Sequence, residues 1–441
     1  MIPRLAVLGA LPTFLLAQGS APPSLSLGEA IRYAAARAVQ SQVGALRVQQ
    51  AAARSTQRRA DLLPSLSLSL GENARTFNTA TLGFSFRDAN GRPAFDPNGQ
   101  VIGPVRVVDA RGTLRAPLLD WSALERWRAA RASADVADAE AAQARDGAGG
   151  RAALAWLRTT RAMALIDARA SDSTLAAELL DIARQQLQAG VGVALDVTRA
   201  NSQYALARAQ LLGARNELAR ARLDLASALG LAREQLPLLL PLSASTSAPL
   251  PTEAEAVQDA LARRADIRAL DTQTFVARRQ LAAIRGERIP ALTAYRDQGA
   301  IGGATAHLLN TYTWSLGVSV GLFDGFRREG RVQEQQLAVQ ELTLRAQDQR
   351  DLATTEVRSA LLDAASATEQ LAAATERLGF ATQELEQARE RFRAGVASNA
   401  DVITASLSLN AARTLVIDAR MAHETARVAL ARASGRLTEL P

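Results

Sequence analysis

Short stretches of the chain alternate between apolar and polar residues, the pattern of a half-buried strand. In residues 65–70 leucine alternates with serine, and in residues 312–322 aromatic, leucine and valine residues alternate with threonine, serine and glycine. A second candidate strand lies across a loop from each stretch, and the first loop is rich in Gly, Pro, Asn and Asp. The pattern therefore predicts two β-hairpins, with strands at about residues 63–72, 112–119, 289–297 and 312–322.

Longer stretches carry an apolar seam with a seven-residue period. Tyr204, Leu211, Leu218 and Leu225 lie seven residues apart with alanine three residues after each, and the spacing recurs from residue 409 to residue 433. Large and small residues alternating along such a seam allow two helices to pack closely. A proline-free stretch of about 68 residues precedes each seam, which as one helix would span about 100 Å. Helices are predicted at about residues 121–188, 196–229, 326–393 and 401–434.

The two sets of elements are copies of one unit. Residues 183–200 and 388–405 are identical at eight of 18 positions, at a constant offset of 205. The offset is 226 where the first strands begin and 204 where the second strands end, so the first copy holds 22 additional residues in its hairpin. The predicted organisation is a first repeat over residues 22–230, a Pro-rich linker over 231–254 and a second repeat over 255–441.

The hairpins provide too few strands for a closed sheet. Four strands cannot close into a barrel, and a sheet that crosses a bilayer must leave no unpaired edge, so several chains are expected to contribute to one barrel. A strand of about eleven residues is long enough to cross at a tilt, and Tyr312 and Trp314 at its start would suit a membrane interface. The fold class predicted is mainly α with a small β part.

The composition of the chain indicates a secretory leader and argues against transmembrane helices and nucleic-acid binding. Residues 1–21 combine an apolar run with small residues before candidate cleavage points after Gly19 or Ala21, as in a signal peptide. No later stretch is long and apolar enough for a transmembrane helix, so any insertion is expected to use strands. The chain has no cysteine and a net charge of +7. Its arginines are interspersed with acidic residues rather than clustered, which argues against nucleic-acid binding.

Catalytic chemistry finds little support. The two histidines, His307 in the second hairpin loop and His423 on a helical seam, have no evident nucleophile or metal partner in the sequence. We find no phosphate-binding glycine loop, nucleophile elbow or metal-ligand spacing. We therefore expect no enzyme activity, no cofactor and no metal site.

Several segments resemble a known family. Residues 25–31 (LSLGEAI), 63–66 (LPSL) and 117–120 (PLLD) occur in order, and Ala189-Gly190-Val191 through Asp196-Val197 is duplicated as Ala394-Gly395-Val396 through Asp401-Val402. Their order, duplication and spacing are similar to those of the TolC-like outer-membrane efflux protein family, the outer membrane factors of tripartite efflux and type I secretion systems. The similarity covers nearly all of the chain after the leader.

The resemblance implies a homotrimer with a twelve-stranded β-barrel continued by an α-helical periplasmic barrel. Such a protein lies in the outer membrane of a Gram-negative-type cell, among outer-membrane lipid. It acts passively, docking with a periplasmic adaptor (membrane fusion) protein and an inner-membrane transporter that supplies the energy.

The resemblance also assigns roles at the two turns between paired helices. These turns would be adaptor-contacting tips, formed by Gly190, Val191, Gly192 and Val193 in the first copy and by Gly395, Val396, Ala397 and Ser398 in the second. Both glycines suit a left-handed helix end.

A periplasmic aperture would involve Asp401, Thr404 and Asp196. Three copies of Asp401 around a trimer axis would favour cations. The family's best-known gate has a carboxylate at the position of Thr404 and an arginine at that of Ala397, so a salt-bridged gate of that kind is not expected. A plainer interpretation makes Asp196 and Asp401 favourable helix-start carboxylates.

Two alternatives to a small-molecule duct remain open. A protein-secretion duct would share the same design, and a soluble periplasmic coiled-coil scaffold would use the strand pairs as a small cap.

Overall fold

The computed structural model describes residues 24–82, 87, 89–91, 96, 98–232, 236–240, 249–305, 307–394, 396 and 398–441, except the side chains of residues 82 and 393. The predicted leader, residues 233–235 and 241–248 of the predicted linker, and Gly395 and Ala397 of the second tip lie outside the described residues. The chain divides into two compact units, one of residues 44–141 and 265–351, called here the sheet unit, and one of the remainder, called the helical unit.

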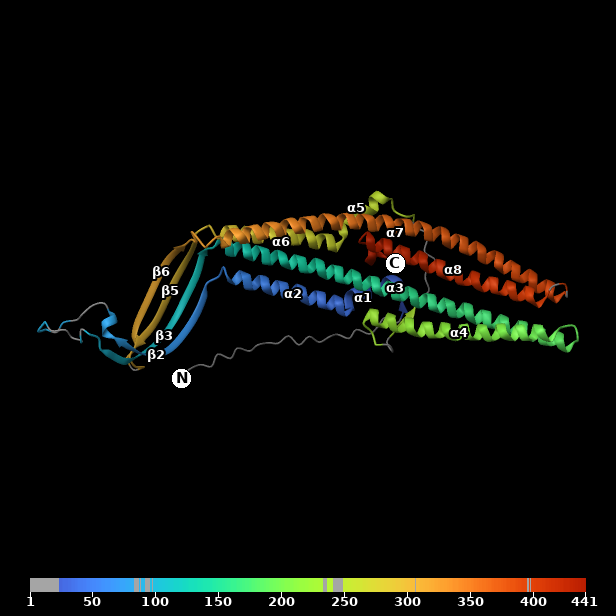
Figure 1. Ribbon diagram of the computed structural model, residues 1–441, viewed down its shortest axis with the longest axis horizontal. Coiled ribbons are helices and arrows are strands. Elements are labelled where there is room, and N and C mark those ends of the chain that lie inside the picture. The colour runs from blue at the N-terminus through green and yellow to red at the C-terminus, as the bar shows by residue number, and fades with distance from the viewer. Residues whose placement is uncertain are drawn as a thin grey trace. The chain divides into compact units, whose positions relative to one another are not determined.

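The sheet unit contains one four-stranded antiparallel sheet in the order β2-β3-β5-β6 (Figure 1). Its strands are β2 (Ser65–Asn78), β3 (Val101–Leu119), β5 (Ala291–Gly302) and β6 (Leu309–Ser319). The central pair, β3 and β5, joins the two copies, and β2 and β6 form the two edges.

The strand boundaries correct the predicted ones. The first hairpin pairs as far as Asn78 with Val101, so its longer strands take up part of the length difference and the connection between them takes up the rest. Gly103 and Pro104, which had indicated a loop, instead lie where the register shifts, as expected for a bulge. The last strand begins and ends three residues earlier than predicted. Its partner strand starts at Ala291, just after Pro290, which has no N–H to extend the ladder.

The short helices before each hairpin are interrupted at matching positions. In the first copy α1 (Leu27–Arg37) is followed by α2 (Val39–Ala60), and in the second α5 (Glu253–Arg263) is followed by α6 (Ala265–Gly286). The interrupting residues, Ala38 and Arg264, both adopt extended ψ values. Within the sheet unit, α6 packs on the first part of α3 through Val276, Ala129 and Ala132.

The long helices agree closely in length. They are α3 (Trp121–Gln188, 68 residues) and α7 (Arg327–Arg393, 67 residues), with return helices α4 (Ala194–Leu229) and α8 (Asn399–Ala433). Among the described residues, no helix combines the length and hydrophobicity needed to cross a bilayer.

Alanines at a seven-residue spacing form the seams of the helical unit. The buried members on α7 are Ala353, Ala360, Ala367, Ala374 and Ala381, and the same spacing recurs on α4 and α8. A strict seven-residue repeat makes packed helices coil around one another. The seam predicted from residues 204–225 is thus present, with its alanines at positions 207, 214 and 221 buried and Leu225 buried beside them.

A larger core in the helical unit surrounds Trp156. Its side chain is 1% exposed, and its Nε1 donates a hydrogen bond to the Leu25 carbonyl at 3.1 Å. Gly149 lies within the continuous helix α3 and allows a close approach of another helix. A Cβ at this position would lie 3.0 Å from Ile31 Cγ2.

Candidate functional site

The sheet presents one apolar and one polar face, and the strand register determines which residue lies on which. Leu66 pairs with Leu114, Leu114 with Arg296, and Arg296 with Trp314, so these four lie on one face. Alternation places Leu68, Leu70, Leu316 and Val318 on the same face, where their side chains are largely exposed. This surface is called here the apolar sheet face.

The opposite face is lined by polar residues. It carries Ser67, Ser69, Thr113 and Thr313 at the alternate positions. At its centre Arg111 Nη1 donates to Asp297 Oδ1 at 2.5 Å, and the same guanidinium contacts Asp109 at 3.3 Å. A sheet with one apolar and one polar face is suited to separating lipid from water.

Tyr312 and Trp314 lie on the apolar sheet face, and the Trp314 side chain is 72% exposed. They occupy the fourth and sixth positions of β6 rather than its start, because the strand begins at Leu309. Their partners across the ladder are the polar residues Gln298 and Arg296.

The first tip is a tight turn with an apolar surface. Gly190 has φ 74°, and Val191 N donates to the Gln186 carbonyl while Gly190 N donates to that of Leu187. These two bonds form the Schellman motif that ends a helix at a left-handed residue. Val191 is 80% exposed, and Val193, which begins α4 without a side-chain cap, is also exposed.

The second tip begins its return helix differently. Val396 is exposed, and its N–H donates to the Arg391 carbonyl as in the first tip. Ser398 forms a capping box with Asp401, in which Ser398 N donates to Asp401 Oδ2 at 3.0 Å and Asp401 N donates to Ser398 Oγ at 3.3 Å. The carboxylate of Asp401 thus has a helix-start role, as in the plainer of the two interpretations.

The two return helices meet near their starts. Asn399, which is buried, donates from Nδ2 to the Asp196 carbonyl at 3.2 Å. The Asp196 carboxylate faces Arg199 on its own helix at 3.8 Å, and the Thr404 hydroxyl donates to the Ala400 carbonyl. The structure therefore brings Asp196 and Asp401 to the starts of two adjoining helices, and Thr404 lies one turn beyond Asp401.

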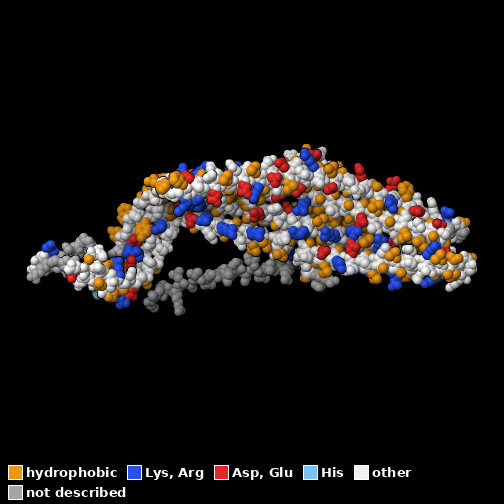
Figure 2. Space-filling view, viewed as in Figure 1, with side chains coloured by type: hydrophobic (Ala, Val, Ile, Leu, Met, Phe, Trp, Pro, Cys, Tyr) orange, Lys and Arg blue, Asp and Glu red, His pale blue; other side chains and the backbone are white. Residues whose placement is uncertain are grey.

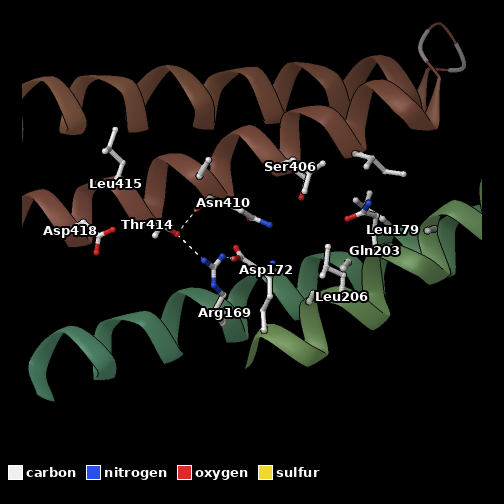
Figure 3. A pocket seen from close by; sticks show the side chains of 17 residues that line it. Arg169, Asp172, Leu179, Gln203, Leu206, Ser406, Asn410, Thr414, Leu415 and Asp418 are labelled. Atoms are coloured by element: carbon white, nitrogen blue, oxygen red, sulfur yellow. Dashed lines mark hydrogen bonds and ion pairs between the residues drawn. The ribbon is translucent and has the colours of Figure 1, made fainter. Parts of the chain in front are cut away.

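The sequence did not indicate a polar cluster that joins α3 of the first copy to α8 of the second (Figure 3). It lines a cavity of about 460 Å³ between α3, α4 and α8. Asp172, 1% exposed, accepts hydrogen bonds from Arg169 at 3.1 Å and from Arg413 at 3.0 Å. Arg169 also donates to the Thr414 hydroxyl at 3.1 Å. Arg161 forms a second link, to Asp418 on α8 at 2.8 Å.

Neither histidine lies in a cluster suited to catalysis. His423 Nδ1 lies 3.4 Å from the neighbouring Glu424 carboxylate, and the His307 backbone N–H donates to the Ala304 carbonyl in the second hairpin loop. In the part of the chain that the structure describes, no group of three or more His, Asp or Glu side chains is placed to hold a metal ion.

Two repeats of strands and long paired helices, with an apolar sheet face and exposed helix turns, form an architecture suited to an outer-membrane channel. The comparison with protein families identifies the family. The chain belongs to the outer membrane efflux protein family, whose model matches residues 30–231 and 256–436.

Solved structures show the same fold. The outer-membrane channel OprN superposes with a TM-score of 0.80 at 18% identity, covering 94% of this chain and 91% of that one. The outer membrane protein VceC from Vibrio cholerae gives 0.75 at 18% identity, with 93% and 96% covered. The open state of the Neisseria gonorrhoeae MtrE outer membrane channel gives 0.78 at 18% identity, with 93% and 89% covered. No curated protein sequence matches the chain significantly. The family and its structural neighbours are channels rather than enzymes.

Proposed function

We propose that the chain is the passive exit duct of a tripartite export system, through which small molecules leave across the outer membrane. The observation that carries this proposal is the two-faced sheet. Its apolar face exposes leucine, valine and aromatic side chains, while its other face carries serine, threonine and the Arg111–Asp297 pair. An apolar exterior and a polar interior are the requirements for a water-filled passage through lipid.

The assembly we propose is a homotrimer. One chain offers four strands with two open edges, β2 and β6, and three copies would supply a closed barrel of twelve strands. The long helices would extend the passage into the periplasm of a Gram-negative-type cell.

We assign the tips to docking with a periplasmic adaptor, which links the duct to an inner-membrane transporter. Val191, Val193 and Val396 are exposed at turns held rigid by backbone hydrogen bonds. Small apolar projections on a rigid turn suit shallow contact with a helical hairpin. Gly192 assists by fitting closely against Gln186 and Leu187, where a side chain would not fit.

Asp401, with Thr404 and Asp196 nearby, is our candidate for the periplasmic aperture. Conductance of the purified protein in a planar bilayer tests the duct, and Asp401→Asn tests the aperture. Asparagine keeps an oxygen that can accept from the Ser398 N–H, so the helix start is preserved while the charge is removed. The matched control is Asp224→Asn, an exposed carboxylate near the other end of α4.

We expect cation preference to fall in Asp401→Asn more than in the control. An unchanged preference would return Asp401 to the helix-start role alone. Failure of the protein to form channels, together with its recovery as a soluble non-trimeric periplasmic protein, would refute the duct and favour the scaffold alternative.

A further inference from the structure

A groove with an excess of positive charge lies among the helices of the sheet unit. It has a volume of about 1020 Å³ and is lined by residues of α2, α3, α6 and α7. Its charged lining consists of five arginines and two acidic residues: Arg47, Arg54, Arg58, Arg126, Arg331, Asp61 and Glu140. Basic side chains gather over α2 in Figure 2. A concave surface with this balance of charge concentrates anions.

One face of α2 provides most of the positive charge. Arg47, Arg54 and Arg58 are spaced by seven and four residues, so they share one side of the helix. Ala51, which is 7% exposed, lies between the first two and keeps the floor of the groove low. The helix contains no acidic residue, and among the described residues neither Arg47 nor Arg54 has an acidic partner.

The acidic residues in and beside the groove already have partners. Arg58 Nη1 lies 3.5 Å from Asp61 Oδ2, and Glu140 accepts a hydrogen bond from α6 at 3.3 Å. Arg331 forms a two-pronged pair with Glu287 at 2.9 Å and 3.0 Å. The positive charge that remains uncompensated is therefore that of the other two α2 arginines of the groove.

The matching helix of the second copy does not carry these charges. At the offset of 226, Gln273 stands where the first copy has Arg47, and Gln280 stands where it has Arg54. Both helices have 22 residues and precede the first strand of their hairpin. The repeat thus forms this helix with uncharged residues at both positions, so its fold does not require the two arginines.

The spacing of the two uncompensated arginines indicates the kind of anion that fits. Arg47 and Arg54 lie two helical turns apart, about 10 Å along the axis. A guanidinium group binds phosphate, sulfate or carboxylate oxygens through paired N–H donors. Gln50 and Gln57 line the same groove and can add amide donors. An anion with one charged group can neutralise only one of the arginines, so a ligand with at least two such groups fits best.

We propose that this groove binds exported cargo that carries two or more negative groups, such as phosphates or carboxylates, with Arg47 and Arg54 as the principal contacts. The cargo assignment rests on the proposed function, because it requires the groove to face the passage. Four helices that line one groove form a concave surface, and the concave surface of each wall faces inward in a closed ring of copies. A binding site on the wall raises the local concentration of such cargo.

Isothermal titration calorimetry of the detergent-purified protein with sodium tripolyphosphate at low salt tests the groove. The test variant combines Arg47→Gln with Arg54→Gln, the residues that the second copy has at these positions. The matched control combines Arg215→Gln with Arg222→Gln, two exposed arginines of α4 that are also seven residues apart. Both variants therefore lose the same net charge.

We expect tripolyphosphate affinity to fall about tenfold in the test variant, because two partly screened charges are lost, and to stay unchanged in the control. Arg47→Lys combined with Arg54→Lys keeps both charges and should retain most of the affinity. Wild-type affinity in the test variant would overturn the groove. An equal loss in the control would also overturn it, since net charge alone would then explain the binding.

A fluorophore at Gln50→Cys distinguishes cargo from lipid headgroups as the source of the anion. The chain contains no cysteine, so the label attaches only at this position. In phosphatidylcholine vesicles we expect quenching by water-soluble acrylamide and none by a nitroxide on the lipid headgroup. Strong quenching by the headgroup nitroxide would place the groove against lipid and overturn the cargo assignment.

Recordings in a planar bilayer separate failure of the groove from failure of the duct. Tripolyphosphate should lower the conductance of the wild type more than that of the Arg47→Gln, Arg54→Gln variant. Channels that conduct but do not bind tripolyphosphate would overturn the groove alone. A protein that binds tripolyphosphate but forms no channel would refute the duct, and with it the assignment of the ligand as cargo.

Discussion

Asp172 offers the sharpest test of how the two copies are joined. Its carboxylate is buried and accepts from Arg169 on its own helix and from Arg413 on α8. Replacement by asparagine keeps the shape of the side chain but removes the charge that both guanidiniums contact. A buried charge network that loses one member is strongly destabilised, because the remaining charges stay in place without compensation.

The size of the destabilisation follows from the two hydrogen bonds that Asp172 accepts. Each charge-assisted hydrogen bond contributes about 1.5–3 kcal/mol. The Arg169 and Arg413 side chains are 18% and 32% exposed, so water screens part of the interaction and the lower end of that range applies. We expect Asp172→Asn to cost about 3 kcal/mol locally, which is roughly a hundredfold change in the opening equilibrium.

Hydrogen exchange of the assembled protein, read by mass spectrometry, measures that opening where it occurs. Peptides around position 172 of α3 and position 413 of α8 should both lose protection. The matched control is Asp181→Asn, also on α3, whose carboxylate is exposed and accepts from Gln185 on the same helix at 2.7 Å. Equal exchange in the two variants, or a loss confined to α3, would refute the cross-copy link.

Four further substitutions test local features. Gly213→Ala should stabilise α4 by about 0.5–1 kcal/mol, since no neighbour lies within 4 Å of the added Cβ, whereas Gly149→Ala should lower the melting temperature because of its tight packing. Hydrogen bonds from the Thr252 hydroxyl and backbone hold the pKa of Glu255 below its ordinary value of 4.5. The stability that Glu255 gives α5 is therefore complete above pH 4.5 and lost as the pH falls through the lowered value, and Thr252→Ala should flatten this dependence in exchange measurements corrected for intrinsic rates. Phe326 has φ 64°, a left-handed conformation that asparagine adopts more readily than a bulky residue. Phe326→Asn should therefore raise the melting temperature in detergent by relieving about 1 kcal/mol of backbone strain, and an unchanged melting temperature would contradict this strain.

Long-period patterns predicted the helices well. The absence of proline led to helices at 121–188 and 326–393, and the structure has Trp121–Gln188 and Arg327–Arg393; the seven-residue alanine spacing led to the return helices at 196–229 and 401–434, and the structure has Ala194–Leu229 and Asn399–Ala433. Such a pattern is repeated many times along a helix, so a few atypical residues do not obscure it. The glycines of α3 illustrate this, because packing against Ile31 keeps Gly149 helical.

Features that depend on distant partners could not be predicted. Asp172 and Arg413 are 241 positions apart, and nothing near either residue indicates that α3 and α8 adjoin. The predicted strand boundaries were wrong for a related reason, because the pairing partners of a strand, rather than its local composition, decide where the ladder ends. The starts of α1 and α5 could have been predicted from the sequence, because Ser26 with Glu29 and Thr252 with Glu255 both have the spacing of a capping box. The positive φ of Phe326, 64°, could not be predicted in this way, because glycine is the residue that adopts such a φ readily and the sequence therefore indicates only Gly325.

The open edges of the sheet govern how the protein must be made. A single chain displays the unpaired N–H and C=O groups of β2 and β6, which can template wrong pairings as readily as correct ones. If the chain assembles as the trimer proposed above, a newly delivered chain can mispair until it meets other copies, and its rate of maturation should depend on concentration. Folding and assembly are then one process, so the stability of an isolated chain is not a defined quantity, and escorts that shield strand edges would determine the yield.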